Sequence, residues 1–90
     1  MGLRWNYRKD RDIKMSGLLA DVAMDLGYLT RSKEYKNCFV DNYVVLTRAQ
    51  VTNIVNTMLT HNDFDLIDMG KYNVLQDWLA DTDEESITFA

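Results

Sequence analysis

The segment 47–59 constrains the fold of this chain most strongly, because it carries a complete helix signal. Its first residues, Thr47-Arg48-Ala49-Gln50, match a capping box, in which the N-cap threonine and a glutamine three positions later bond each other's backbone N–H groups. Apolar residues then repeat at helical spacing along one face: Val51, Ile54, Val55, Met58 and Leu59. We therefore expect an amphipathic helix with Thr47 as its N-cap.

The opposite face of this helix carries no charge. It consists of Thr52, Asn53, Asn56, Thr57 and Thr60. Helix faces in water usually carry lysine and glutamate. We expect this face to be partly buried against another part of the fold, with a partner's surface as the alternative.

Two further helices are expected, at 16–27 and 71–81. Ser16 is a suitable N-cap for the first, and Gly27 stands where a left-handed C-terminal residue is favoured. The third helix has an apolar face made by Tyr72, Val74, Leu75, Trp78 and Leu79. Asp21 and Asp25 lie on the outer face of the first helix, and Asp77 and Asp81 on that of the third.

The remaining regular segments alternate with a period of two and predict strands. They are 3–7, a central hairpin within 35–46 that turns at Asp41-Asn42, and 87–89, which is placed to pair with the N-terminal strand. The expected fold class is α+β. Residues 1–90 would form one small domain, with about three helices packed on a small antiparallel sheet.

Composition limits the environment and the cofactors. The 90 residues contain one cysteine, Cys38, and no apolar run long enough to cross a membrane. Small secreted domains usually carry several cysteines, so we expect a cytoplasmic protein that does not associate with a membrane. We expect Cys38 to be a buried, inert thiol.

The segment His61-Asn62-Asp63-Phe64-Asp65-Leu66-Ile67-Asp68-Met69-Gly70 raises the question of a metal site. A calcium loop that starts at Asp63 would need a glutamate at its twelfth position, where Val74 stands. A weak magnesium pair at Asp63 and Asp65, or a site that adds His61, is conceivable but lacks further ligands. We expect no metal and no cofactor. Phe64, Leu66 and Ile67 should anchor this loop inward while its three aspartates project from it.

Catalytic motifs are not found in the sequence. Cys38 and His61 are the candidate nucleophile and base, yet apolar neighbours raise rather than lower a thiol pKa. Neither a phosphate-binding glycine loop nor a serine nucleophile motif is present. We therefore expect a protein that is not an enzyme.

Charge divides the chain into two unlike halves. Residues 1–48 carry nine Lys/Arg against six Asp/Glu, whereas residues 49–90 carry one lysine against eight Asp/Glu. The halves therefore have net charges of +3 and −7 and predict an oppositely charged partner for the second. The eight carboxylates of that half are Asp63, Asp65, Asp68, Asp77, Asp81, Asp83, Glu84 and Glu85.

An acidic surface of this kind can imitate the phosphates of nucleic acid. Our leading hypothesis is an inhibitor or adaptor that binds a basic, nucleic-acid-binding protein, in the manner of a viral or mobile-element antagonist of a nuclease or polymerase. One alternative is a winged-helix-like nucleic-acid binder that uses a basic N-terminal arm, although we expect direct nucleic-acid binding to be the weaker reading. That arm comprises Arg4, Arg8, Lys9, Arg11 and Lys14. A second alternative is an assembly subunit that forms a homo-oligomer.

Overall fold

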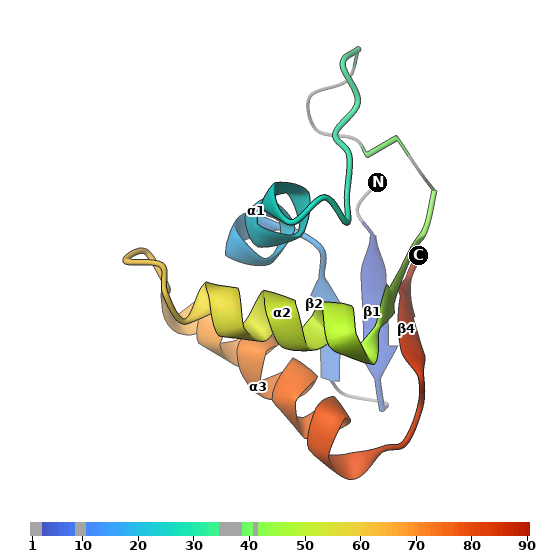
Figure 1. The fold of residues 1–90 in the computed structure, drawn as a ribbon, viewed down its shortest axis with the longest axis vertical. Coiled ribbons are helices and arrows are strands. Elements are labelled where there is room, and N and C mark those ends of the chain that lie inside the picture. The colour runs from blue at the N-terminus through green and yellow to red at the C-terminus, as the bar shows by residue number, and fades with distance from the viewer. Residues whose placement is uncertain (1–2, 9–10, 35–38, 41) are drawn as a thin grey trace.

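The structure is a computed structural model that describes residues 3–8, 11–34, 39–40 and 42–90 (Figure 1). Three helices and four short strands are formed in these residues, which confirms the α+β class. In chain order the elements are β1 (Arg4–Tyr7), β2 (Arg11–Lys14), α1 (Gly17–Asp25), β3 (Val44–Thr47), α2 (Arg48–Met58), α3 (Leu66–Asp81) and β4 (Ser86–Phe89). No helix in the described residues is long and apolar enough to cross a membrane.

The strands form two antiparallel pairs rather than one sheet. β1 pairs with β2, and β3 pairs with β4. β2, which the sequence analysis did not predict, returns antiparallel to β1, and Arg8 after β1 takes a positive φ of 63°. The predicted pairing of the two terminal strands is replaced by a smaller contact. Arg4 and Ala90 exchange two backbone hydrogen bonds, of 3.0 and 2.8 Å.

The central hairpin predicted within 35–46 is wrong for the residues that the structure describes. β3 pairs with β4 far along the chain, and Phe39 forms an isolated bridge with Arg31. Alternation in β3 shows that one face is buried but does not identify the neighbouring strand, and β4 offers the same alternation. Residues 35–38 and 41, and with them Cys38, lie outside the described residues.

The residues predicted to start or end the first two helices are confirmed in these positions. Ser16 is the N-cap of α1, and Gly27 follows the helix with a φ of 82°, a conformation that favours glycine. In α2, the Thr47 hydroxyl accepts from the Gln50 N–H at 3.2 Å, and the Gln50 side chain accepts from the Thr47 N–H at 2.9 Å. The Ser16 hydroxyl makes no capping bond of its own.

The uncharged face of α2 is mostly exposed, so the partial burial predicted for it holds only at Thr57, which is half-buried. Thr52, Asn53 and Asn56 are exposed, whereas the apolar face of the helix is buried except for Leu59 at its end, which is 55% exposed. The Thr52 and Thr57 hydroxyls donate to carbonyls one turn earlier, at 2.9 and 2.7 Å. Bonds within the helix thus satisfy the two threonines, whereas the Asn53 amide donates to the Tyr28 hydroxyl of a neighbouring segment at 3.0 Å.

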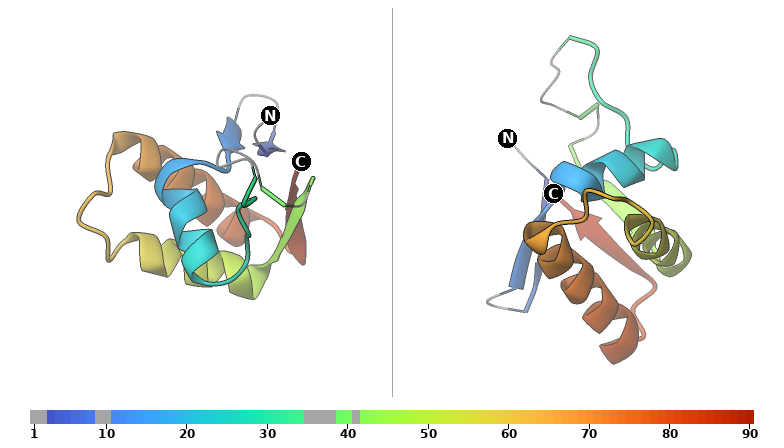
Figure 2. Two further views of the ribbon diagram at one scale, coloured as in Figure 1. Left: turned by 90° about the horizontal axis from the view of Figure 1, so that it is seen from above. Right: turned by 90° about the vertical axis from the view of Figure 1, so that its left-hand side faces the viewer.

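The core lies between the helices and the two strand pairs. Figure 2 shows the helices grouped on one side, with the strands and both termini on the other. Trp78 and Phe89 are the largest fully buried side chains, and Trp5 packs against both, with ring centroids 6.1 and 6.0 Å apart. These aromatic contacts join β1, α3 and β4.

Candidate protein-interaction surface

Helix α3 begins five residues earlier than the predicted 71, and its first turns carry exposed apolar residues. Asp65 is the N-cap, and Leu66 and Ile67 form the first turn. Leu66 is 84% exposed and Ile67 71%, so the prediction that both anchor inward is wrong. Phe64 does pack, edge to face, against Tyr72 at 5.9 Å. The first turn of α3 lies at the end of the molecule away from β3 and β4 (Figure 1), so the core does not cover it.

Two of the three aspartates in this segment form a helix cap. The Asp65 carboxylate accepts from the Asp68 N–H at 2.9 Å, and the Asp68 carboxylate accepts from the Asp65 N–H at 3.2 Å. The bond from the Asp68 N–H lowers the pKa of the Asp65 carboxyl below its usual value. Asp68 is buried, at 6% exposure, and therefore does not project to a partner as the sequence predicted.

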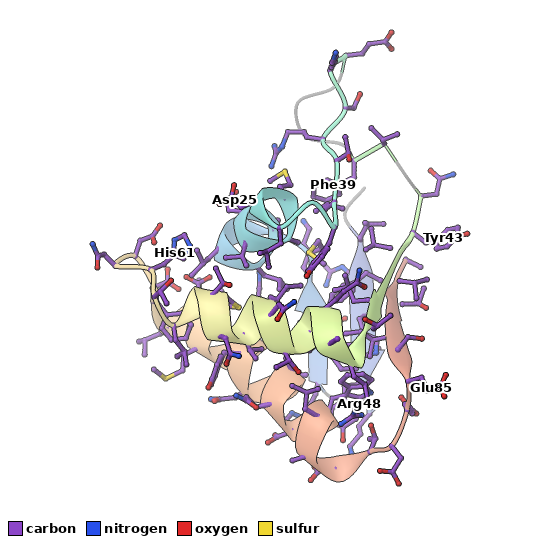
Figure 3. All side chains as sticks on the ribbon, viewed as in Figure 1. Asp25, Phe39, Tyr43, Arg48, His61 and Glu85 are labelled. Atoms are coloured by element: carbon purple, nitrogen blue, oxygen red, sulfur yellow. The ribbon has the colours of Figure 1, made fainter. Side chains whose placement is uncertain are left out.

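The third aspartate, Asp63, meets α1 instead. Asp63, His61, Asp21 and Asp25 line a hollow of about 460 Å³ together with Leu18 and Met24. His61 Nδ1 lies 3.8 Å from Asp63 Oδ1, and Figure 3 shows Asp25 and His61 at the same end of the molecule. No group of three or more His, Cys, Asp or Glu among the described residues is arranged to hold a metal ion.

Exposed apolar residues surround the same helix–helix connection. We use the name turn surface for this region, which comprises Leu59, Leu66, Ile67 and Met69 with the acidic residues Asp21, Asp25 and Asp63. Sequence reasoning did not include Asp21 and Asp25 among the site residues, although it placed both on the outer face of their helix. Their approach to Asp63 depends on the packing of α1 against α2, which no local pattern encodes.

The remaining acidic residues lie toward the opposite end of α3, where Asp77 is about 14 Å from Asp68 along the helix at 1.5 Å per residue. Asp77 pairs with Arg11, Asp81 lies 3.7 Å from Arg8, and a Glu84 carboxylate oxygen accepts from the Trp78 indole N–H at 3.0 Å. Asp83 and Glu85 are exposed. The structure therefore divides the eight predicted carboxylates into two groups, which are too far apart to act electrostatically as one.

The predicted basic arm also divides. Arg4 pairs with Asp12 at 2.8 Å, while Arg8 and Arg11 pair with the acidic end of α3. Lys14 lines a groove together with Arg4, Arg11 and a residue that the sequence analysis did not select, Lys71. Lys9 lies outside the described residues.

The chain has no match among known proteins in three comparisons, with protein-family models, with curated protein sequences and with solved structures.

Proposed function

We propose that this chain is a non-enzymatic protein-interaction domain that binds a basic partner protein through its turn surface. The observation that carries the proposal is the pair Leu66 and Met69, which are 84% and 44% exposed and lie one helical turn apart, close in sequence to the acidic hollow around Asp63. Burying a leucine side chain is worth about 1.5–3 kcal/mol. A partner that covers this turn would therefore gain hydrophobic free energy.

The lack of charge on α2 supports the same surface. Thr52, Asn53 and Asn56 are exposed and uncharged, and their stripe ends at Leu59, which is 55% exposed. Charged residues are depleted from the centres of protein interfaces, whereas free surfaces usually carry both signs. The exposed, uncharged face of α2 would therefore extend the turn surface toward the N-terminus of this helix.

The acidic residues indicate the charge of the partner. Asp21 and Asp25 are exposed, and neither makes an ion pair with a described residue. In a symmetric dimer formed through this surface, the acidic hollows of both copies would approach each other and repel. A partner with basic residues around an apolar cleft fits better than a second copy.

The most specific form of the proposal is inhibition of a nucleic-acid-processing enzyme, as by a viral or mobile-element antagonist. Such an enzyme binds the phosphates of nucleic acid through positively charged side chains. Carboxylates held on a helix and a short connection can pair with these side chains in place of the phosphates. Direct nucleic-acid binding is less well supported, because Arg4, Arg8 and Arg11 already face carboxylates that a phosphate would have to displace.

The test measures how variants in the apolar and the acidic part of the turn surface bind one partner. A protein captured from a host lysate is purified and titrated against the wild type, a Leu66→Ser/Met69→Ser variant and an Asp21→Asn/Asp25→Asn variant. We expect each variant to weaken binding about tenfold or more, and the acidic variant to reduce the dependence of affinity on salt.

The matched control is Asp83→Asn/Glu85→Gln, which removes the same charge from the other end of α3. We expect it to bind like the wild type. If the control loses affinity while the two turn-surface variants keep it, the proposed surface is wrong. If sedimentation instead shows that the wild type dimerises and the Leu66→Ser/Met69→Ser variant does not, the surface joins two copies and the proposal of a basic partner fails.

A further inference from the structure

A groove between β2 and the first half of α3 gathers positive charge from three elements. Its volume is about 650 Å³, within the range of small-molecule sites. Four cations line it, from β1, β2 and α3: Arg4, Arg11, Lys14 and Lys71. Among the described residues that line it, Asp12 is the one carboxylate.

The two arginines form short ion pairs and the two lysines do not. Arg4 pairs with Asp12, and Arg11 pairs with Asp77 outside the groove. Neither lysine forms an ion pair with any carboxylate in the described part of the chain. Lys14 also stands directly opposite Arg4 in the β1–β2 register, an arrangement of like charges that destabilises a strand pair.

Lys71 is the buried member of this group, at 9% exposure. Its ammonium donates to the Ser16 carbonyl at 2.9 Å and to the Ser16 hydroxyl at 3.0 Å. An ammonium has three N–H groups, so one remains for a ligand. Burial lowers the pKa of Lys71; the Asp68 carboxylate opposes this effect, and Lys14 adds to it. An anion in the groove would relieve both the burial cost and the repulsion between the lysines.

We propose that this groove binds a small phosphate monoester, whose dianion lies between Lys14 and Lys71. Two ammonium groups that form no direct ion pair with a described carboxylate match the charge of a phosphate dianion better than that of a single carboxylate. Ile67, exposed at the end of the groove, offers apolar surface to the organic part of the ligand. The groove shares Ile67 with the turn surface, but Lys14 and Lys71 do not belong to that surface and Leu66 and Met69 do not line the groove, so the inference does not rest on the proposed protein contact.

The experiment is an NMR titration of the full chain with phenyl phosphate at constant ionic strength. We expect saturable shifts of backbone amides in β2 and in the first half of α3, with a Kd of about 1 mM or tighter. Benzenesulfonate carries the same ring with one charge and should bind more weakly. Lys14→Gln should weaken phenyl phosphate about fivefold, the size expected for one partly screened ion pair.

The matched control is Lys33→Gln, which removes an exposed lysine from a loop outside the groove. The Lys33→Gln variant should bind like the wild type. The Lys71→Gln variant should weaken binding if it folds. If the Lys71→Gln variant does not fold, the result for Lys14→Gln tests the inference. Shifts that do not saturate, or equal losses in Lys14→Gln and Lys33→Gln, would overturn the inference. So would a single-stranded oligonucleotide that binds more than about tenfold tighter than phenyl phosphate and depends on Lys14.

Discussion

Asp65 and Asp68 show how a residue pattern that resembles a ligand cluster can serve the backbone instead. Each carboxylate accepts the other residue's backbone N–H group, so both are used at the start of α3. Free N–H groups in the first helical turn attract carboxylates, which the helix dipole also favours. Neither residue is therefore free to bind a cation in the way that a metal-loop interpretation requires.

The cap makes a prediction about acid stability. Because the pKa of Asp65 is lowered by the bond from the Asp68 N–H, the stabilisation is present above the unfolded value of 3.8 and is lost as pH falls through the folded value. Asp65→Asn keeps an acceptor but cannot titrate, so its stability should change less between about pH 5 and pH 2. Urea unfolding across this range measures the difference.

Asp83→Asn is the control for this prediction, because Asp83 is exposed and makes no ion pair with a described residue. It should keep the acid dependence of the wild type. Equal flattening of the profile in both variants would mean that net charge, rather than the cap, governs acid unfolding.

At the level of elements, the sequence predicts what is encoded locally. The capping box of α2 and the glycine after α1 involve residues at most four positions apart, and both are confirmed. The start of α3 was missed because the N3 residue of its capping box is an aspartate, Asp68, rather than the usual glutamate or glutamine. The partner of β3 was missed because β4 lies about forty residues away, and alternation alone does not specify pairing.

The candidate surface was only partly predictable for the same reason. Asp63 was selected from its neighbours in the chain, but its approach to Asp21 and Asp25 depends on how α1 packs. Leu66 and Ile67 look like core residues in the sequence, because apolar type alone does not reveal that a helical turn extends beyond the core. Their exposure follows from the length of α3 and the position of its first turn.

The exposure of Leu66 makes a second prediction, at the level of helix α3. Leu66→Ala should change the free energy of unfolding by less than about 0.5 kcal/mol, as exposed substitutions usually do. Leu75→Ala, the same change at a residue with 1% exposure in the same helix, should cost about 2–5 kcal/mol through the cavity that it leaves. Urea unfolding of both variants is the measurement. A cost above about 2 kcal/mol at Leu66 would show that its side chain is buried in solution.

Across the whole molecule, the two oppositely charged halves of the sequence fold onto each other. The β1–β2 hairpin packs beside α3, which brings Arg11 to Asp77 and Arg8 to Asp81. A net charge of −7 for the second half therefore overstates the acidity of any single surface. The carboxylates around the hollow at α1 keep their charge uncompensated by the N-terminal arginines.

Arg48, the first residue of α2, contacts the C-terminal end of α3 and the segment that follows it. Its guanidinium donates to the carbonyls of Leu79, Thr82 and Glu84 and lies 5.0 Å from the centre of the Trp78 ring. The last carbonyls of a helix have no partner within it, and from the start of α2 this arginine satisfies that of Leu79 in the last turn of α3 and that of the C-cap Thr82. Figure 3 shows Arg48 and Glu85 in this region, on the side away from Asp25 and His61.

Arg48→Lys tests this role. A lysine keeps the charge but lacks the planar fork that reaches three carbonyls, so we expect a loss of about 1–3 kcal/mol in the free energy of unfolding. Arg4→Lys is the matched control, because Arg4 makes one exposed ion pair with Asp12 and should lose less than about 0.5 kcal/mol. Equal losses in the two variants would contradict the structural role. Because Arg48 joins α2, α3 and the approach to β4, its loss should also lower the hydrogen-exchange protection of β4 amides more than that of α1.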